Sequence, residues 1–229
     1  MPLISVMRQN VPGQSAAQHE RLVRYIAERA REDADALKWT TRIGTGTAGR
    51  IVSFVSRVDG FAALASQEDP DVMIRRLYGE GDGNALVEAL GEATSGTSYQ
   101  VLNVREDLGT QGTLLDAPAP LAVITRLRPT PSGSRGCEEL IRQVTAAAGK
   151  VDDQRRYIVM QPSIGDLGTY VIAQGVTDPA QLDRQGSVPE LLAEALGASE
   201  GDKAWTEGVT CIQEATSELS VLREDLSNV

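Results

Sequence analysis

Val104-Arg-Glu-Asp-Leu108 and Leu222-Arg-Glu-Asp-Leu226 are nearly identical pentapeptides that lie 118 residues apart (222 − 104) in this chain. The same offset pairs similar residues far upstream of both motifs: Leu3 with Leu121, Arg8 with Arg126, Leu22 with Leu140, Ile26 with Val144 and Trp39 with Tyr157. Recurrence of many positions at one spacing is typical of an internal duplication. The sequence therefore predicts two tandem repeats, residues 1–115 and residues 116–229.

Each repeat shows the same predicted order of elements. A short aliphatic strand precedes an amphipathic helix, in which apolar residues recur every three or four positions. Two strands joined by a glycine-containing turn come next, followed by a helix and a last strand. In the first repeat we predict strands at 3–8, 38–43, 50–58 and 98–105 and helices from about 15 to 36 and at 83–93. In the second repeat we predict strands at 121–127, 155–161, 168–176 and 217–223 and a helix at 203–213. This β-α-β-β-α-β order predicts an α+β protein of two tandem ferredoxin-like repeats with antiparallel sheets.

Two aspartate–proline pairs indicate additional short helices. Asp69-Pro70 and Asp178-Pro179 each place a good N-cap residue directly before a proline. Aspartate accepts hydrogen bonds from the first backbone amides of a helix, and proline fits the first helical position because it lacks an amide hydrogen. We therefore expect a helix to begin at each pair.

The composition narrows the classes of function. The 229 residues carry 22 Lys and Arg against 32 Asp and Glu, a net charge of −10, which argues against nucleic acids and anionic membranes as partners. One histidine and two cysteines are too few for a zinc site, so we expect no metal. The N-terminus lacks the basic segment of a signal peptide, and no apolar stretch reaches the roughly 18 residues of a membrane span. We expect a cytoplasmic protein with reduced thiols.

Gly44-Thr-Gly46-Thr-Ala-Gly49 matches the dinucleotide-binding pattern G-x-G-x-x-G. That function requires a helix to begin at the glycines, so that its N-terminus can hold a pyrophosphate. The residues that follow are β-branched and typical of a strand instead. The motif therefore predicts a hairpin turn, and we expect no cofactor.

Three residues of the first repeat are catalytic candidates because the second repeat replaces them with chemically different residues. His19 lies on the apolar side of the first helix, where the second repeat has Cys137. Either it acts as a general base or it packs between helix and sheet. Tyr99 and Asn103 lie in the last strand, and Asn103 either meets a ligand or bonds neighbouring backbone.

Three further residues are candidates for substrate binding. Arg8 ends the first strand, Trp39 begins the second strand, and Arg42 follows it within that strand. An arginine retained in both repeats, as Arg8 is by Arg126, can recognise an anion or pair with acidic neighbours. For Trp39, which aligns with Tyr157, core packing is the alternative to ligand contact.

By element order and duplication, the chain resembles the dimeric α/β-barrel superfamily, in which two ferredoxin-like units pair their sheets. The resemblance implies a pseudo-dimer of the same kind within this chain. Members include cofactor-independent monooxygenases of antibiotic biosynthesis, polyketide cyclases, muconolactone isomerases and haem-binding chlorite-dismutase-like proteins, and fold alone does not choose among them. The resemblance implies a cofactor-independent oxygenase, isomerase or cyclase that acts on a small hydrophobic, aromatic or polyketide-like molecule. The alternative is a noncatalytic ligand-binding or oligomerisation module, with self-association into a homo-oligomer. A haem-binding variant is a third hypothesis.

Overall fold

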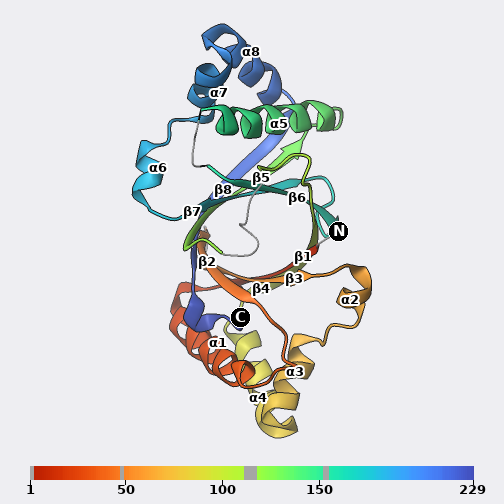
Figure 1. The fold of residues 1–229 in the computed structure, drawn as a ribbon. Helices are drawn as coiled ribbons and strands as arrows, with labels where there is room; N and C mark the ends of the chain where they lie inside the picture. The colour runs from red at the N-terminus through yellow and green to blue at the C-terminus, as the bar shows by residue number, and fades with distance from the viewer. Residues whose placement is uncertain (1–2, 47–48, 111–117, 152–154) are drawn as a thin grey trace. The chain divides into compact units, whose positions relative to one another are not determined.

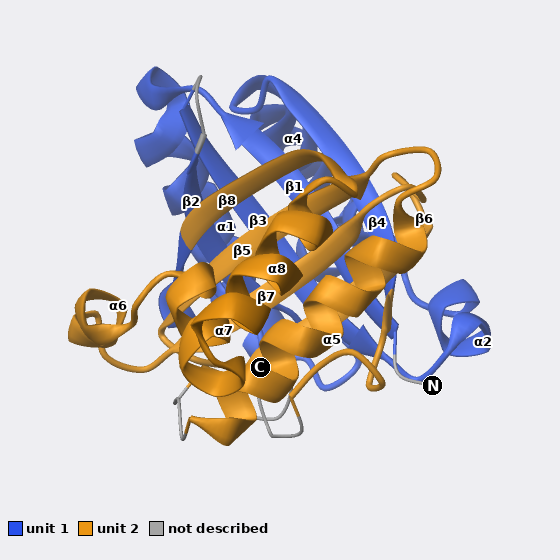
Figure 2. Cartoon of the chain, turned by 90° about the horizontal axis from the view of Figure 1, so that it is seen from above, with its two compact units in different colours: residues 1–102, 220–229 blue, residues 103–219 orange. Residues whose placement is uncertain are grey.

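The structure is a computed structural model that describes residues 3–46, 49–110, 118–151 and 155–229. It is an α+β protein whose chain forms two compact units (Figures 1 and 2). Unit 1 comprises residues 1–102 and 220–229, and unit 2 comprises residues 103–219. The predicted boundary between residues 115 and 116 lies outside the described residues.

Helices alternate with antiparallel strands in both halves of the chain (Figure 1). The first half contains β1 (Leu3–Val11), α1 (Ala16–Arg31), β2 (Thr40–Gly46), β3 (Gly49–Val58), α2 (Phe61–Ala65), α3 (Pro70–Tyr78), α4 (Glu80–Glu92) and β4 (Gly96–Val104). The second contains β5 (Leu121–Pro129), α5 (Ser134–Lys150), β6 (Tyr157–Ile164), β7 (Tyr170–Val176), α6 (Ala180–Arg184), α7 (Val188–Leu196), α8 (Ala198–Val209) and β8 (Ile212–Leu222). Short 3-10 turns, η1 (Gly13–Ser15) and η2 (Glu224–Leu226), precede α1 and follow β8.

The strands follow one another in the hydrogen-bonding order β1-β3-β2-β8-β5-β7-β6-β4, a closed antiparallel barrel. In unit 1, β3 pairs with both β1 and β2, and β2 also pairs with residues 220–222 of β8. In unit 2, β7 pairs with both β5 and β6. The strands of the two units thus pair in the same order.

The register of these strands repeats with the offset seen in the sequence. Arg8 lies opposite Ser53, which lies opposite Arg42. In unit 2 the corresponding row is Arg126, Val171 and Met160. Each residue of the second row follows its counterpart by 118 positions (126 − 8, 171 − 53 and 160 − 42).

Each unit buries an apolar layer between its helices and one face of its sheet. In unit 1, Ile26 and Ala30 of α1 pack with Met73 and Ile74 of α3. In unit 2, Leu140 of α5 packs with other buried residues, Ala147, Ala148, Tyr157, Leu191 and Leu192. Burying these side chains is the main stabilising contribution in each unit.

The glycine motif forms a hairpin turn, as predicted. β2 and β3 pair antiparallel up to Gly46 opposite Gly49, and residues 47–48 lie outside the described part of the chain. Gly49 has a φ of 150°, and a Cβ atom there would lie 2.3 Å from the carbonyl oxygen of Val11. No helix begins at the motif, so the helix N-terminus that a pyrophosphate requires does not form here.

The end of the second repeat differs from the sequence prediction. The helix predicted at 203–213 is Ala198–Val209, and the strand predicted at 217–223 begins earlier, at Ile212. The sequence did not predict that β8 begins at Ile212, because the first part of the strand is exposed. Its polar residues, such as Gln213 and Glu214, do not alternate with apolar residues.

Candidate functional site

A row of polar residues crosses three adjacent strands of unit 1. Arg8 of β1 and Arg42 of β2 flank Ser53 of β3 in direct register. Neighbouring strands lie about 4.8 Å apart, which places the two arginine Cα atoms roughly 10 Å from each other. Residues in register across a sheet point to the same face, so both guanidinium groups and the serine hydroxyl share one surface.

This surface is the face of the sheet away from the helices. Val52, next to Ser53, packs with Val11 and Ala16, and Phe54 packs against the cluster around α1 and α3. Because side chains alternate along a strand, Ser53 points to the opposite side from Val52 and Phe54. The row therefore stands apart from the core of unit 1.

The electrostatics of the row favour an anionic ligand. All three side chains are half-buried, and burial lowers the pKa of the Arg42 guanidinium. Two guanidinium groups on one half-buried surface create a positive potential that attracts an anion. The guanidinium groups and the hydroxyl are hydrogen-bond donors suited to a carboxylate or an enolate oxygen.

The corresponding row of unit 2 lacks this character. Val171 and Met160 replace Ser53 and Arg42, and only Arg126 remains charged. Its Nη1 donates to Oε1 of Glu218 at 2.9 Å, which neutralises the charge. Sequence reasoning named Arg8 and Arg42 but missed Ser53, although comparison with Val171 at the same offset would have revealed it.

His19 lies on the other face of the same sheet. Its side chain is fully buried, and Nε2 is 2.7 Å from Oε1 of Gln9, which pairs with Val52 on the helix side. No described residue forms a hydrogen bond with Nδ1. Burial lowers the pKa of His19 to about 4, although the charge of Glu20 acts in the opposite direction, so the imidazole is neutral near pH 7. The sheet separates His19 from the arginine row.

Trp39 forms hydrogen bonds with Leu226 and Asn228. Its side chain is 6% exposed, and Nε1 donates to the carbonyl oxygen of Leu226 at 2.9 Å. The backbone of Trp39 also exchanges hydrogen bonds with Asn228. Its indole thus already has a structural partner, which supports the packing alternative.

The two candidates in β4 belong to different units. Tyr99, in unit 1, is 47% exposed. Asn103, in unit 2, donates through Nδ2 to Oγ of Ser163, while its buried Oδ1 has no hydrogen-bond partner within the described part of the chain. Among the predicted residues, the arrangement within unit 1 brings only Arg8 and Arg42 onto a shared surface. Catalytic roles for His19, Tyr99 and Asn103 remain predictions.

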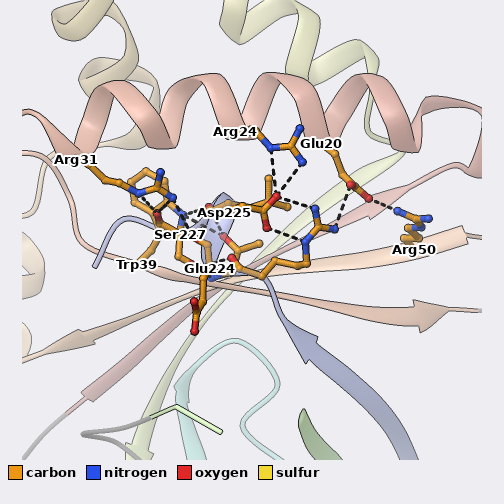
Figure 3. Close-up of polar contacts among 11 residues, drawn as sticks. Glu20, Arg24, Arg31, Trp39, Arg50, Glu224, Asp225 and Ser227 are labelled. Carbon is orange, nitrogen blue, oxygen red and sulfur yellow. Dashed lines mark hydrogen bonds and ion pairs between the residues drawn. The ribbon is translucent and has the colours of Figure 1, made fainter. Parts of the chain in front are cut away.

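The repeated Arg-Glu-Asp-Leu motifs form ion-pair networks that sequence reasoning only partly anticipated. In unit 1, Arg223 donates to both carboxylate oxygens of Asp225, at 2.8 Å each, and to Oε2 of Glu20 at 3.1 Å. Figure 3 shows Glu20 and Arg24 of α1 reaching toward this segment, where Arg24 also bonds Asp225. The hydrogen bonds of Arg223 and then of Arg24 hold the pKa of Asp225 well below its usual range.

Unit 2 repeats the network with one addition. Arg105 bonds Asp107 in the same bidentate way and reaches Oε1 of Glu138 at 2.9 Å. Glu138 follows Glu20 by 118 positions, and it also accepts a hydrogen bond from the hydroxyl of Tyr170. Each arginine thus pairs with the aspartate two residues along the chain and with a glutamate on the first helix of the same unit.

The part of the chain that the structure describes contains no cluster of three or more His, Cys, Asp or Glu residues suited to a metal ion. Within the same residues, no helix combines the length and apolar character needed to cross a membrane.

No protein-family model and no curated relative matches this sequence. Several solved structures nevertheless match over nearly the whole chain. A candidate monooxygenase of Fusobacterium nucleatum subsp. nucleatum has 8% sequence identity, covers 96% of this chain and 92% of its own, and gives a TM-score of 0.60. An anthrone oxidase-like protein has 13% identity, with 97% and 92% coverage and a TM-score of 0.60.

A chlorite dismutase of Candidatus Nitrospira defluvii, in complex with imidazole, has 9% identity, 98% and 93% coverage and a TM-score of 0.51. At these identities the likeness concerns the fold. The chain thus shares its fold with proteins described as a candidate monooxygenase, an anthrone oxidase-like protein and a chlorite dismutase.

Proposed function

We propose that this protein binds a small acidic or enolisable aromatic molecule and acts on it as a cofactor-independent oxygenase, isomerase or cyclase. The observation that carries the proposal is the row of Arg8, Ser53 and Arg42 on one face of the sheet of unit 1. Half-buried guanidinium groups stabilise an oxygen anion more strongly than exposed ones, because water screens them less.

The proposal extends to the architecture. The constant offset of 118 residues in strand register supports two tandem ferredoxin-like repeats, 1–115 and 116–229, of the dimeric α/β-barrel type. On this proposal only the first repeat has an anion site in this row. In the second repeat, the apolar residues Val171 and Met160 occupy the corresponding positions.

In the proposed reaction, an enolisable substrate transfers a proton to water and becomes an enolate, whose oxygen is bound by Arg8 and Arg42. For an oxygenase, the enolate carbon then reacts with O₂, the second substrate. With anthrone as the probe, one O₂ is consumed, and one anthraquinone and one water are formed. The arginines stabilise the negative charge as it develops.

The test compares wild-type protein with Arg42→Gln and Arg8→Gln, using anthrone and an oxygen electrode. We expect oxygen uptake and anthraquinone formation above the rate without protein, with a reduction of about tenfold or more in either variant. Arg57→Gln, which removes an exposed arginine of β3 outside the row, is the matched control and should keep wild-type activity.

A calorimetric measurement of the binding of 2-naphthoate, an aromatic carboxylate, separates the enzyme hypothesis from that of a noncatalytic binding module. Binding that depends on Arg42, without oxygen uptake or product, would favour the noncatalytic ligand-binding module. Absence of binding and of turnover would refute the proposed site. Arg42→Lys distinguishes charge from geometry, because lysine keeps the charge but loses the planar pair of donors.

A further inference from the structure

A cavity lies wholly within unit 2, in the part of the chain that the structure describes. Its volume is about 270 Å³, and it is lined by residues at the end of α5, by α6 and the residues that follow it, and by the first turns of α7. This volume lies near the lower limit of ligand-binding pockets, and suits a molecule of a few non-hydrogen atoms.

A buried cation contributes to the wall of this cavity. Arg155 lines it and is only 5% exposed. Its charge also acts on Glu190, whose pKa is lowered mainly by hydrogen bonds from Ser187 and to a smaller extent by Arg155. Glu190 Oε2 accepts from both the backbone nitrogen and the hydroxyl of Ser187, at 2.6 and 2.8 Å. This carboxylate is therefore engaged in capping α7.

A buried amide donor lies in the same wall. Gln185 lines the cavity, and its Oε1 accepts a hydrogen bond from Nε2 of Gln174 at 2.7 Å. That bond fixes the orientation of the Gln185 amide. Its Nε2 is buried and has no hydrogen-bond partner among the residues that the structure describes. A buried donor without a partner costs free energy, which an acceptor in the cavity would recover.

The remaining wall limits the size and charge of the ligand. Val151 and Leu191 supply apolar surface, and Leu191 is 2% exposed. Arg184 also lines the cavity, but its Nη2 is already paired with Oδ2 of Asp178 at 3.3 Å. The exposed Glu194 lies one helical turn beyond Glu190 on α7 and adds a negative charge to the lining. A second negative charge on a ligand would be repelled there.

We propose that this cavity binds a small monocarboxylate, whose carboxylate is held by Arg155 and Nε2 of Gln185 and whose short apolar part contacts Val151 and Leu191. The site is separate from the arginine row of unit 1 and does not depend on the function proposed for that row. It gives unit 2 a binding role that its own row, with Val171 and Met160, lacks.

The experiment is a titration of the full ¹⁵N-labelled chain, followed by the amide resonances of residues 181–191. The probes are isobutyrate, its neutral analogue isobutyramide and the dicarboxylate succinate, at constant ionic strength. We expect saturable shifts with isobutyrate in the millimolar range, and at least tenfold weaker binding of the other two. Gln185→Leu should weaken isobutyrate binding by about tenfold or more, because it removes the donor. Gln213→Leu, on the exposed part of β8, is the control and should bind as wild type.

Glu194→Gln provides a second test that does not depend on the folding of Gln185→Leu. Removing the negative charge should tighten isobutyrate binding severalfold and improve succinate binding more. The proposal is overturned if isobutyrate causes no saturable shifts, if isobutyramide binds equally well, or if folded Gln185→Leu keeps wild-type affinity. Unchanged affinities in Glu194→Gln would also contradict it.

Discussion

Single residues show where the two halves of the chain differ. Arg8 and Arg126 occupy the same position in their rows, but Arg126 is paired with Glu218, and Val171 and Met160 stand where unit 1 has Ser53 and Arg42. The sequence comparison found His19 and Cys137 by the same logic, yet both are fully buried on the helix side. Divergence between repeats therefore marks candidate positions without separating ligand contacts from repacked core. The face of the sheet on which a residue lies separates candidate ligand contacts from core residues. That face can be assigned only once the strand register is known.

The buried state of His19 predicts a dependence of stability on pH. Burial lowers the pKa of His19 to about 4 in the folded protein, against an ordinary value of 6.5. The unfolded state therefore binds more protons between these values, and the stabilising contribution, complete above pH 6.5, is lost as the pH falls toward 4. We expect His19 to account for on the order of 2 kcal/mol of this loss.

Urea unfolding at pH 7 and pH 4.5 measures the effect. His19→Gln keeps a hydrogen-bonding side chain but cannot titrate, so the variant should lose less stability than wild type over this range. An identical loss in both proteins would show that His19 is not buried in the neutral form.

Secondary-structure elements were predicted well where local chemistry decides them. The Asp69-Pro70 pair begins α3 as expected, since Asp69 Oδ1 accepts a hydrogen bond from the backbone nitrogen of Asp71 at 2.9 Å. The β2–β3 hairpin also formed at its glycines. By contrast, β8 was predicted too short, because its exposed residues leave no alternating pattern. Elements whose surroundings determine their burial carry no such local signal.

The N-cap of α3 predicts a measurable loss of stability. Asp69→Ala removes the acceptor of the Asp71 amide and should destabilise the protein by about 1 kcal/mol. Asp69→Asn keeps a side-chain oxygen at the same position, so most of the stability should return. Chemical denaturation of the three proteins tests this, and equal stability of Asp69→Ala and wild type would rule out a capping role.

At the scale of the whole molecule, the repeated pentapeptides explain why the compact units differ from the sequence repeats. Residues 103–104 at the end of β4 belong to unit 2, and residues 220–222 at the end of β8 belong to unit 1. The arginine that follows each strand forms an ion pair with a glutamate on the first helix of its compact unit. Arg105 pairs with Glu138 of α5 in unit 2, and Arg223 pairs with Glu20 of α1 in unit 1. The sequence offset predicts two repeats, but it cannot show with which compact unit the last segment of each predicted repeat folds.

This arrangement predicts that equivalent substitutions affect different units. Asp225→Asn weakens the segment whose backbone bonds Trp39 and Thr41, through Asn228 and Arg223. Asp107→Asn weakens the segment whose backbone bonds Tyr157 and Val159, through Thr110 and Arg105. Both aspartates are partly exposed, so each loss should be modest, and amide exchange should rise about three- to fivefold.

Hydrogen exchange followed by mass spectrometry locates these effects. Asp225→Asn should speed exchange in residues 39–41 and 223–228 of unit 1 and leave residues 105–110 and 157–159 of unit 2 unchanged, and Asp107→Asn should do the reverse. If the last segments instead folded within their own sequence repeats, Asp225→Asn would act on residues 157–159 and Asp107→Asn on residues 39–41. The crossed pattern therefore tests the exchange of segments directly, because no local effect of either substitution produces it.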